Sequence, residues 1–336
     1  MEIPWESGGA TGIGSLPYED VDEAARVVMG ELPELAHVPE LPARGAGADM
    51  VGRTASLLVD MHVDLQPSGW RLVDRAGADE RRAAALLRAD LDAVQIAAHG
   101  YAGALKVQVA GPLTLAAAID RPRGDRVLAD YGARRDLAQS LAEGVRQHVA
   151  DVAERVPGAR VVVQIDEPGL PSVLAGAVPT WSGFGRMRAV DAAEAESLLA
   201  EVLTAAGQAP IVHSCAADVP VALLRRAGAA AVAVDVSLLA GAVLDELAGA
   251  VDGGLVLWPG VVPALRPTRP PSDRELAERV QRLFQRIDAD PVRMAAAMVV
   301  TPACGLAGAD VPWAREAYRL ARGASRIFGE LVGVSG

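Results

Sequence analysis

Short runs of valine, isoleucine and leucine alternate along this chain with long stretches in which apolar residues recur at helical spacing. Short apolar runs are typical of buried strands, and a period of three to four residues is typical of amphipathic helices. Their alternation predicts repeated βα units and a parallel sheet. We expect eight strands, at Thr11–Ser15, His37–Leu41, Leu105–Ala110, Arg160–Ile165, Ala209–His213, Ala231–Asp235, Leu255–Trp258 and Met298–Thr301.

Five long helices are expected among these strands. The clearest start signal is Ser272-Asp-Arg-Glu275, which has the spacing of a capping box. The helices are predicted at Ala78–His99, Asp130–Val156, Asp191–Ala206, Ser272–Asp288 and Val311–Val332. A single α/β domain over residues 1–336, folded as a (β/α)8 TIM-type barrel, is the simplest architecture, and a doubly wound open sheet is the alternative.

Composition narrows the class of protein. Of the 336 residues, 51% are hydrophobic, which is ample for a large core, and the formal net charge of −11 argues against a nucleic-acid surface. Two cysteines are too few for a disulfide framework. The N-terminus has no signal-peptide pattern, and acidic residues interrupt the most apolar tract, Ala227–Ala250, so no membrane span is expected. We therefore expect a cytoplasmic protein that acts on small molecules.

Both cysteines fall where a predicted strand ends. His213 and Cys215 follow one apolar run, Asp235 ends the next, and Cys304 follows the last. In a TIM barrel the carboxyl ends of the strands meet at the active face, and histidine, cysteine and carboxylate side chains are zinc ligands. The other readings are that the cysteines are small buried apolar residues and that Asp235 caps a helix.

Two further acidic residues end the strand predicted at Arg160–Ile165. Asp166 and Glu167 form either a functional carboxylate pair or a polar turn before Pro168. Because functional side chains in barrels follow the strands, we favour a functional role for Asp166.

Six segments of this chain resemble, in order, the catalytic domain of the cobalamin-independent methionine synthase family. The resemblance covers nearly the whole chain and implies a TIM-like barrel with a zinc ion at its mouth. The segments are Ile13-Gly14-Ser15, Gly111-Pro112-Leu113-Thr114, Gln164-Ile165-Asp166-Glu167-Pro168, His213-Ser214-Cys215, Pro259-Gly260-Val261 and Pro302-Ala303-Cys304-Gly305-Leu306.

The resemblance also implies roles for individual residues. It implies that zinc is held by His213, Cys215, Cys304 and Asp235, the last standing where the family has a glutamate. It implies that Gly14, Ser15 and Asp166 bind the amino-acid end of a homocysteine-like thiol, with Ser15 and Asp166 as the residues that support catalysis. The implied reaction is methylation of that thiol to give methionine, with zinc holding the sulfur as a reactive thiolate.

The residues expected on the donor side depart from the family. Arg44–Ala48 replaces an acidic cluster, small residues at Ala116–Ala118 replace a tryptophan that stacks on folate, and Leu265–Pro267 replaces a histidine-containing proton donor. We therefore do not expect folate to donate the methyl group in the usual mode. A corrinoid protein or another methyl donor is the expected partner.

Two alternative functions remain open from the sequence. The first is a metal-free lyase like the related uroporphyrinogen decarboxylases, in which Asp166 acts together with Arg44 or Arg266. The second is a non-catalytic metallo-barrel that binds a thiol.

Overall fold

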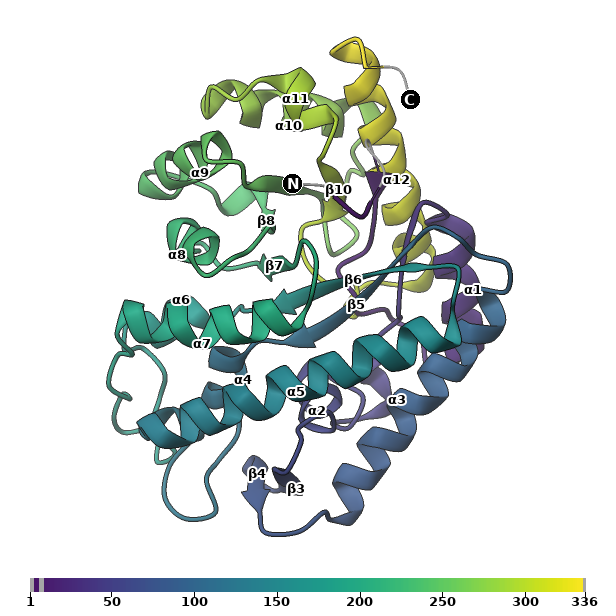
Figure 1. The fold of residues 1–336 in the computed structure, drawn as a ribbon. Helices are drawn as coiled ribbons and strands as arrows, with labels where there is room; N and C mark the ends of the chain where they lie inside the picture. The colour runs from purple at the N-terminus through teal and green to yellow at the C-terminus, as the bar shows by residue number, and fades with distance from the viewer. Residues whose placement is uncertain (1–2, 6–8, 335–336) are drawn as a thin grey trace.

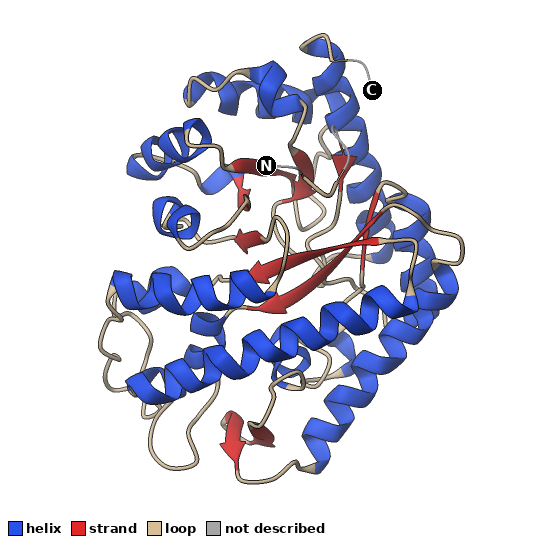
Figure 2. Ribbon diagram, viewed as in Figure 1, coloured by secondary structure: helices blue, strands red, loops and turns tan. Residues whose placement is uncertain are grey.

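The computed structural model describes residues 3–5 and 9–334. Eight parallel strands form one curved sheet in the order β1-β10-β9-β8-β7-β6-β5-β2, and helices surround it (Figures 1 and 2). The strands are β1 (Gly9–Ala10), β2 (Leu35–His37), β5 (Ala104–Ala110), β6 (Arg160–Asp166), β7 (Ile211–Ser214), β8 (Ala231–Asp235), β9 (Val256–Val262) and β10 (Val299–Pro302). The predicted TIM-type barrel is confirmed.

The two edge strands of the sheet, β1 and β2, meet through the segments that follow them. Leu16 N donates to the Glu40 carbonyl oxygen at 2.8 Å, and Glu40 N donates to the Gly14 carbonyl oxygen at 3.1 Å. These bonds form a parallel bridge between Ser15 and Glu40. We call this bridge the seam, because it makes the sheet a nearly closed barrel rather than an open doubly wound one.

The helices and short helical turns follow the order expected of βα units. Side-chain caps begin many of them, and the predicted capping box of α10 is present between Ser272 and Glu275. The bounds are α1 (Val21–Glu31), η1 (Pro42–Arg44), α2 (Met50–Ala55), α3 (Ala78–Ala97), α4 (Pro112–Ala118), η2 (Val127–Ala129), α5 (Tyr131–Arg155), α6 (Leu170–Leu174), α7 (Ala192–Ala205), α8 (Val221–Arg226), η3 (Val236–Leu238), α9 (Ala242–Asp252), α10 (Asp273–Arg286), α11 (Pro291–Ala295) and α12 (Val311–Leu331). None of the helices in residues 3–5 and 9–334 is both long and apolar enough to cross a membrane.

The barrel has an apolar floor beneath its active face. Ala231, Ala233 and Trp258 point into the barrel, and Trp5 packs edge-on against Trp258 with the ring centroids 5.0 Å apart. Trp5 Nε1 also donates to the Ala297 carbonyl oxygen at 2.8 Å. Strands of a parallel sheet are buried on both faces, which explains why these segments read as continuous apolar runs.

The structure differs from the sequence-based expectation in two places. The strands predicted at Thr11–Ser15 and His37–Leu41 are shorter and lie earlier, because the chain leaves the sheet to form the seam. A hairpin of β3 (His62–Gln66) and β4 (Gly69–Val73) was not predicted. It lies between α2 and α3, outside the barrel sheet (Figure 1).

Candidate active site and metal centre

Three of the predicted metal ligands gather at the carboxyl ends of β7 and β10. One ligand atom from each of His213, Cys215 and Cys304 lies within 4.8 Å of the other two. The two sulfur atoms are 3.0 Å apart, although 89 positions separate the cysteines in the chain. A histidine nitrogen and two thiolates are a donor set that suits zinc, and catalytic zinc sites use three protein ligands with one open position.

The imidazole of His213 is oriented by the neighbouring strand β8. Its Nδ1 atom lies 3.1 Å from the Ala233 carbonyl oxygen. A carbonyl oxygen only accepts, so Nδ1 carries the proton and Nε2 keeps its lone pair for a metal. Orientation of a ligand histidine by a second hydrogen bond is characteristic of metal sites.

The two thiols share a hydrogen bond that shifts their pKa values in opposite directions. Their mutual hydrogen bond lowers the pKa of Cys304 to about 4 and raises the pKa of Cys215, and His213 contributes to the lowering at Cys304. Both side chains are partly exposed and neither is in a disulfide. A thiolate is the form of cysteine that binds metals, so the cluster is electrostatically prepared for a cation.

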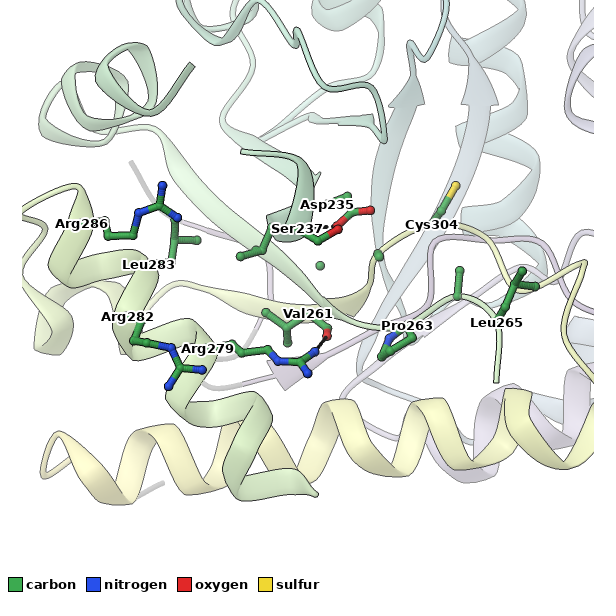
Figure 3. Close-up of a pocket in the computed structure, with 14 residues that line it drawn as sticks. Asp235, Ser237, Val261, Pro263, Leu265, Arg279, Arg282, Leu283, Arg286 and Cys304 are labelled. Carbon is green, nitrogen blue, oxygen red and sulfur yellow. Dashed lines mark hydrogen bonds between the residues drawn. The ribbon is translucent and has the colours of Figure 1, made fainter. Parts of the chain in front are cut away.

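The carboxylate of Asp235 lies beside this cluster but is engaged elsewhere. Its Oδ1 atom accepts from Ser237 N at 2.8 Å and from Ser237 Oγ at 2.6 Å, which caps the short turn η3 (Figure 3). Asp235 also lines a cavity of about 750 Å³ that reaches Cys304. The structure thus gives Asp235 the capping role that the sequence left open, and places it on the same cavity wall as one thiol.

A second cavity, of about 320 Å³, lies directly over the cluster and is called the inner cavity here. Gly14, Ser15 and Asp166 line it together with the three clustered ligands. The predicted substrate-binding residues and the predicted metal ligands other than Asp235 therefore face one common space.

Glycines allow the loops around the inner cavity to approach closely. A Cβ atom on Gly14 would lie 2.7 Å from Gln108 Nε2, and one on Gly305 would collide with Ser15 Oγ. Leu306 N donates to the Ser15 carbonyl oxygen at 2.8 Å, which joins the loop after β10 to the seam. Ser15 and Cys304 are held side by side in this way.

Asp166, Glu40 and Asp49 are the acidic residues that line the inner cavity, and the first two are almost completely buried. Asp166 is 5% exposed and Glu40 is 6% exposed. Burial raises the pKa of Asp166 to about 7 and raises that of Glu40 as well. Two desolvated carboxyl groups that face one space favour a ligand that carries a positive charge.

Glu40 is a candidate site residue that was not predicted. The sequence does indicate a site role for Glu40, because Glu40 lies near the end of the predicted strand His37–Leu41, just as Asp166 follows the predicted strand Arg160–Ile165. The resemblance places an acidic cluster before Asp49-Met50-Val51, where this chain has Arg44–Ala48 instead. The criterion of a polar residue at a strand end identifies it when it is applied to every strand.

A lysine is buried inside the barrel below the two carboxyl groups. Lys106 Nζ donates to the Ile13 carbonyl oxygen at 2.9 Å and to Gln164 Oε1 at 2.8 Å. Gln164 Nε2 in turn donates to Asp166 Oδ1 at 2.7 Å. Burial lowers the pKa of Lys106 to about 7, opposed by the charges of Asp166 and Glu40. This chain of hydrogen bonds fixes the orientation of the Asp166 carboxyl group.

Glu167, the neighbour of Asp166, points away from the inner cavity. Its carboxylate accepts from Leu113 N at 2.8 Å, Thr114 N at 3.0 Å and Thr114 Oγ1 at 2.7 Å. These donors belong to the first turn of α4, where a negative charge is favourable. Glu167 therefore stabilises the N-terminus of α4. Of the two acidic residues, only Asp166 lies in the wall of the inner cavity.

The basic residues considered for a lyase are engaged in ion pairs. Arg44 binds Asp90 through two bonds of 2.7 and 2.9 Å, and Arg266 binds Asp310 through two bonds of 2.8 Å. Neither arginine is among the described residues that line the inner cavity.

Comparison with known proteins agrees with this geometry. The family described as the catalytic domain of cobalamin-independent synthase matches residues 9–326. A B12-independent methionine synthase from Shewanella sp. W3-18-1, solved with selenomethionine, superposes with a TM-score of 0.62 at 12% identity, covering 97% of this chain and 99% of that one. A β-galactosidase from the psychrophilic Marinomonas ef1 superposes less well, with a TM-score of 0.47 at 12% identity, covering 97% of this chain and 61% of that one. No curated protein matches the sequence.

The family match spans almost the full sequence, and the superposed methionine synthase has a similar fold. The chain belongs to the family of cobalamin-independent methionine synthase catalytic domains.

Proposed function

We propose that this protein is a zinc-dependent methyltransferase that activates a homocysteine-like thiol and methylates its sulfur, giving methionine. The observation that carries the proposal is the common space shared by the His213, Cys215 and Cys304 cluster and by the Ser15, Glu40 and Asp166 side chains. The first group suits a thiophilic metal, and the second suits an amino acid.

Within the inner cavity, the metal cluster would bind the sulfur end of the substrate, and Ser15, Glu40 and Asp166 would bind its amino-acid end. When bound, zinc supplies the Lewis acidity that keeps a substrate sulfur deprotonated at neutral pH. Asp166 and Glu40 pair with the substrate ammonium group, and the Ser15 hydroxyl donates to its carboxylate. The sulfur then attacks the donor methyl group, so that a sulfur–carbon bond forms while the bond from the methyl carbon to the leaving group breaks.

Asp235 lies outside the group of three clustered ligand atoms, and its role within this proposal is that of a fourth ligand from the same cavity wall as Cys304. Its place on the cavity wall supports this role, and because Ser237 engages Oδ1, Oδ2 would be the oxygen available to hold a metal. The methyl donor we propose is a corrinoid protein or another methyl donor, rather than folate in its usual mode. The need for reduced thiols supports a cytoplasmic location.

The decisive experiment measures metal content and sulfur coordination together. We expect about one equivalent of zinc in the purified protein, and X-ray absorption should detect an added sulfur neighbour when homocysteine is present. Cys215→Ser should lose the metal. Less than about half an equivalent of zinc in the wild type, with Cys215→Ser making no difference, would refute the proposal.

The two alternatives predict different results in the same experiment. A metal-free lyase keeps its activity when both cysteines are replaced, and the ion pairs of Arg44 and Arg266 do not favour it. A non-catalytic metallo-barrel binds zinc and thiol but forms no methionine from homocysteine and a methylcobalamin donor.

A further inference from the structure

The larger cavity, of about 750 Å³, carries a group of positive charges that the proposed reaction does not yet use (Figure 3). Arg279, Arg282 and Arg286 of α10 line it. They are three and four positions apart, so they lie on one face of the helix. We call this space the arginine cavity.

The arginine cavity extends from these guanidinium groups to the proposed metal centre. Cys304 and Asp235 line it as well. Figure 3 shows Arg282 and Arg286 at one end of the view, Cys304 at the other and Asp235 between them. A ligand lying in this cavity would therefore have one end near the reacting sulfur and the other end among the arginines.

Among the described residues, only one of these three arginines has a carboxylate partner, and that ion pair is long. Arg279 donates to the Val261 carbonyl oxygen at 3.3 Å, and Arg282 reaches Glu278 only at 3.9 Å. Neither Arg279 nor Arg286 has a carboxylate partner in residues 3–5 and 9–334. This contrasts with Arg44 and Arg266, which are each bound by two hydrogen bonds to an aspartate.

The chemistry of the cavity identifies a class of ligand. Apolar side chains such as Val261, Pro263 and Leu283 form part of its wall beside the arginines. The volume falls within the range of roughly 300–1,000 Å³ that holds small organic molecules. Guanidinium groups bind carboxylates and phosphates through paired hydrogen bonds.

We propose that the arginine cavity is the donor-side binding site, and that it takes a small organic molecule bearing carboxylate or phosphate groups. This inference rests on the proposed methyl transfer. The anionic end of the ligand binds Arg279, Arg282 and Arg286, and its methyl-bearing end lies near Cys304. The inner cavity remains available for the thiol.

The test is direct binding of two probes to the zinc-loaded full-length protein at low ionic strength. Tricarballylate represents carboxylate ligands and glycerol 2-phosphate represents phosphate ligands, and calorimetry measures the Kd of each. We expect at least one probe to bind. Replacing Arg279, Arg282 and Arg286 together by glutamine should raise its Kd by at least about 10-fold. The probe that binds more tightly identifies the anionic group of the natural donor.

A matched variant distinguishes specific binding in the arginine cavity from nonspecific attraction by the positive charge of the protein. Replacing Arg274, Arg315 and Arg326 by glutamine removes the same three charges from exposed positions that do not line the arginine cavity. We expect this variant to bind the probes within about 2-fold of the wild type. Equal weakening in both triple variants, or no binding of either probe to the wild type, would overturn the proposal.

A second measurement tests the donor-side position. Saturating homocysteine should leave the probe Kd unchanged within about 2-fold, because the two ligands occupy different cavities. Displacement of the probe by homocysteine would overturn the assignment. Cobalt-substituted protein reports separately on the thiol through a sulfur-to-cobalt absorption band. Absence of that band in the wild type would refute the proposed function, whereas arginine-independent probe binding would refute only the anion site.

Discussion

The inner cavity and the arginine cavity share the Cys304 side chain but hold their charges in different ways. Asp166 and Glu40 of the inner cavity are almost completely buried, whereas the Arg282 side chain of the arginine cavity is 59% exposed. Buried charges interact strongly and penalise an unpaired partner, while exposed charges are screened by water and salt. We therefore expect the inner cavity to discriminate strongly between ligands and the arginine cavity to accept a wider range of them.

The difference extends to how the side chains are supported. Asp166 is oriented through Gln164 and Lys106 by hydrogen bonds that reach across the barrel interior. The arginines project from one helix, and among the described residues only Arg279 of the three is bonded to another element, through the Val261 carbonyl oxygen on β9. A change of acceptor would require several buried changes, whereas a change of donor could arise from substitutions on α10 alone.

The largest effect is expected where the two cavities meet. Cys304→Ala removes a proposed metal ligand, so we expect loss of bound zinc and a fall in methyl transfer of at least about 1,000-fold. The control is Ser214→Ala, because Ser214 points to the opposite face of β7 from His213. Elemental analysis and a methionine assay measure both variants. Full zinc content in Cys304→Ala would remove Cys304 from the ligand set.

The next effect tests how strongly the inner cavity discriminates between thiols with and without an amino group. Asp166→Asn should lower kcat/KM for homocysteine by about 100-fold, since it removes a buried charge that pairs with the substrate ammonium group. For 4-mercaptobutyrate, which has no amino group, the same variant should change kcat/KM little. Glu167→Gln serves as the control, because Glu167 points into α4 instead. An equal fall in kcat/KM with both thiols would show that Asp166 does not bind the substrate ammonium group.

A smaller effect is expected at Asp235. Asp235→Asn keeps the oxygen that accepts from Ser237 but loses the charge, so we expect the zinc Kd to rise by about 10-fold. Ser237→Ala leaves the carboxylate in place and should change the zinc Kd less. Competition with a chromophoric chelator measures both. An unchanged zinc Kd in Asp235→Asn would leave Asp235 as a turn cap only.

The smallest effect lies outside both cavities and separates unfolding from loss of activity in acid. Burial lowers the pKa of His148, on α5, to about 4. Its folded pKa lies below its unfolded value, so its contribution to stability is present above the unfolded value of 6.5 and is lost as the pH falls. His148→Gln should therefore lose less stability than the wild type between pH 6.5 and 5.5, by about 1 kcal/mol, in urea titrations. An identical pH dependence would contradict the assignment.

The sequence predicted the repeated βα units well because buried parallel strands leave a plain apolar pattern. The strand predicted at Ala231–Asp235 has the same bounds in the structure, and the five long helices begin and end within two residues of expectation. The hairpin of β3 and β4 was missed. It is short, and its two strands are stabilised mainly by pairing with each other, which the pattern of a single segment does not reveal.

The site was predictable only as far as its chemistry lay at strand ends. His213, Cys215 and Cys304 could be named because cysteines are scarce in this chain and strand ends converge. Glu40 and Lys106 were missed for different physical reasons. Glu40 reaches the cavity through the seam, and Lys106 is a charged residue enclosed in an otherwise apolar strand. The capping of η3 by Asp235 depends on local geometry that the sequence left open.

The seam has a consequence for how the protein becomes functional. Gly14, Ser15 and Glu40 belong both to the bridge that closes the barrel and to the wall of the inner cavity. The wall of the inner cavity also contains Cys304, which follows β10, and β10 pairs with β1. This wall is therefore complete only when the first and last strands of the barrel have joined. A ligand of the inner cavity would then bind only molecules whose barrel is closed. Its binding would stabilise newly folded molecules in that closed state.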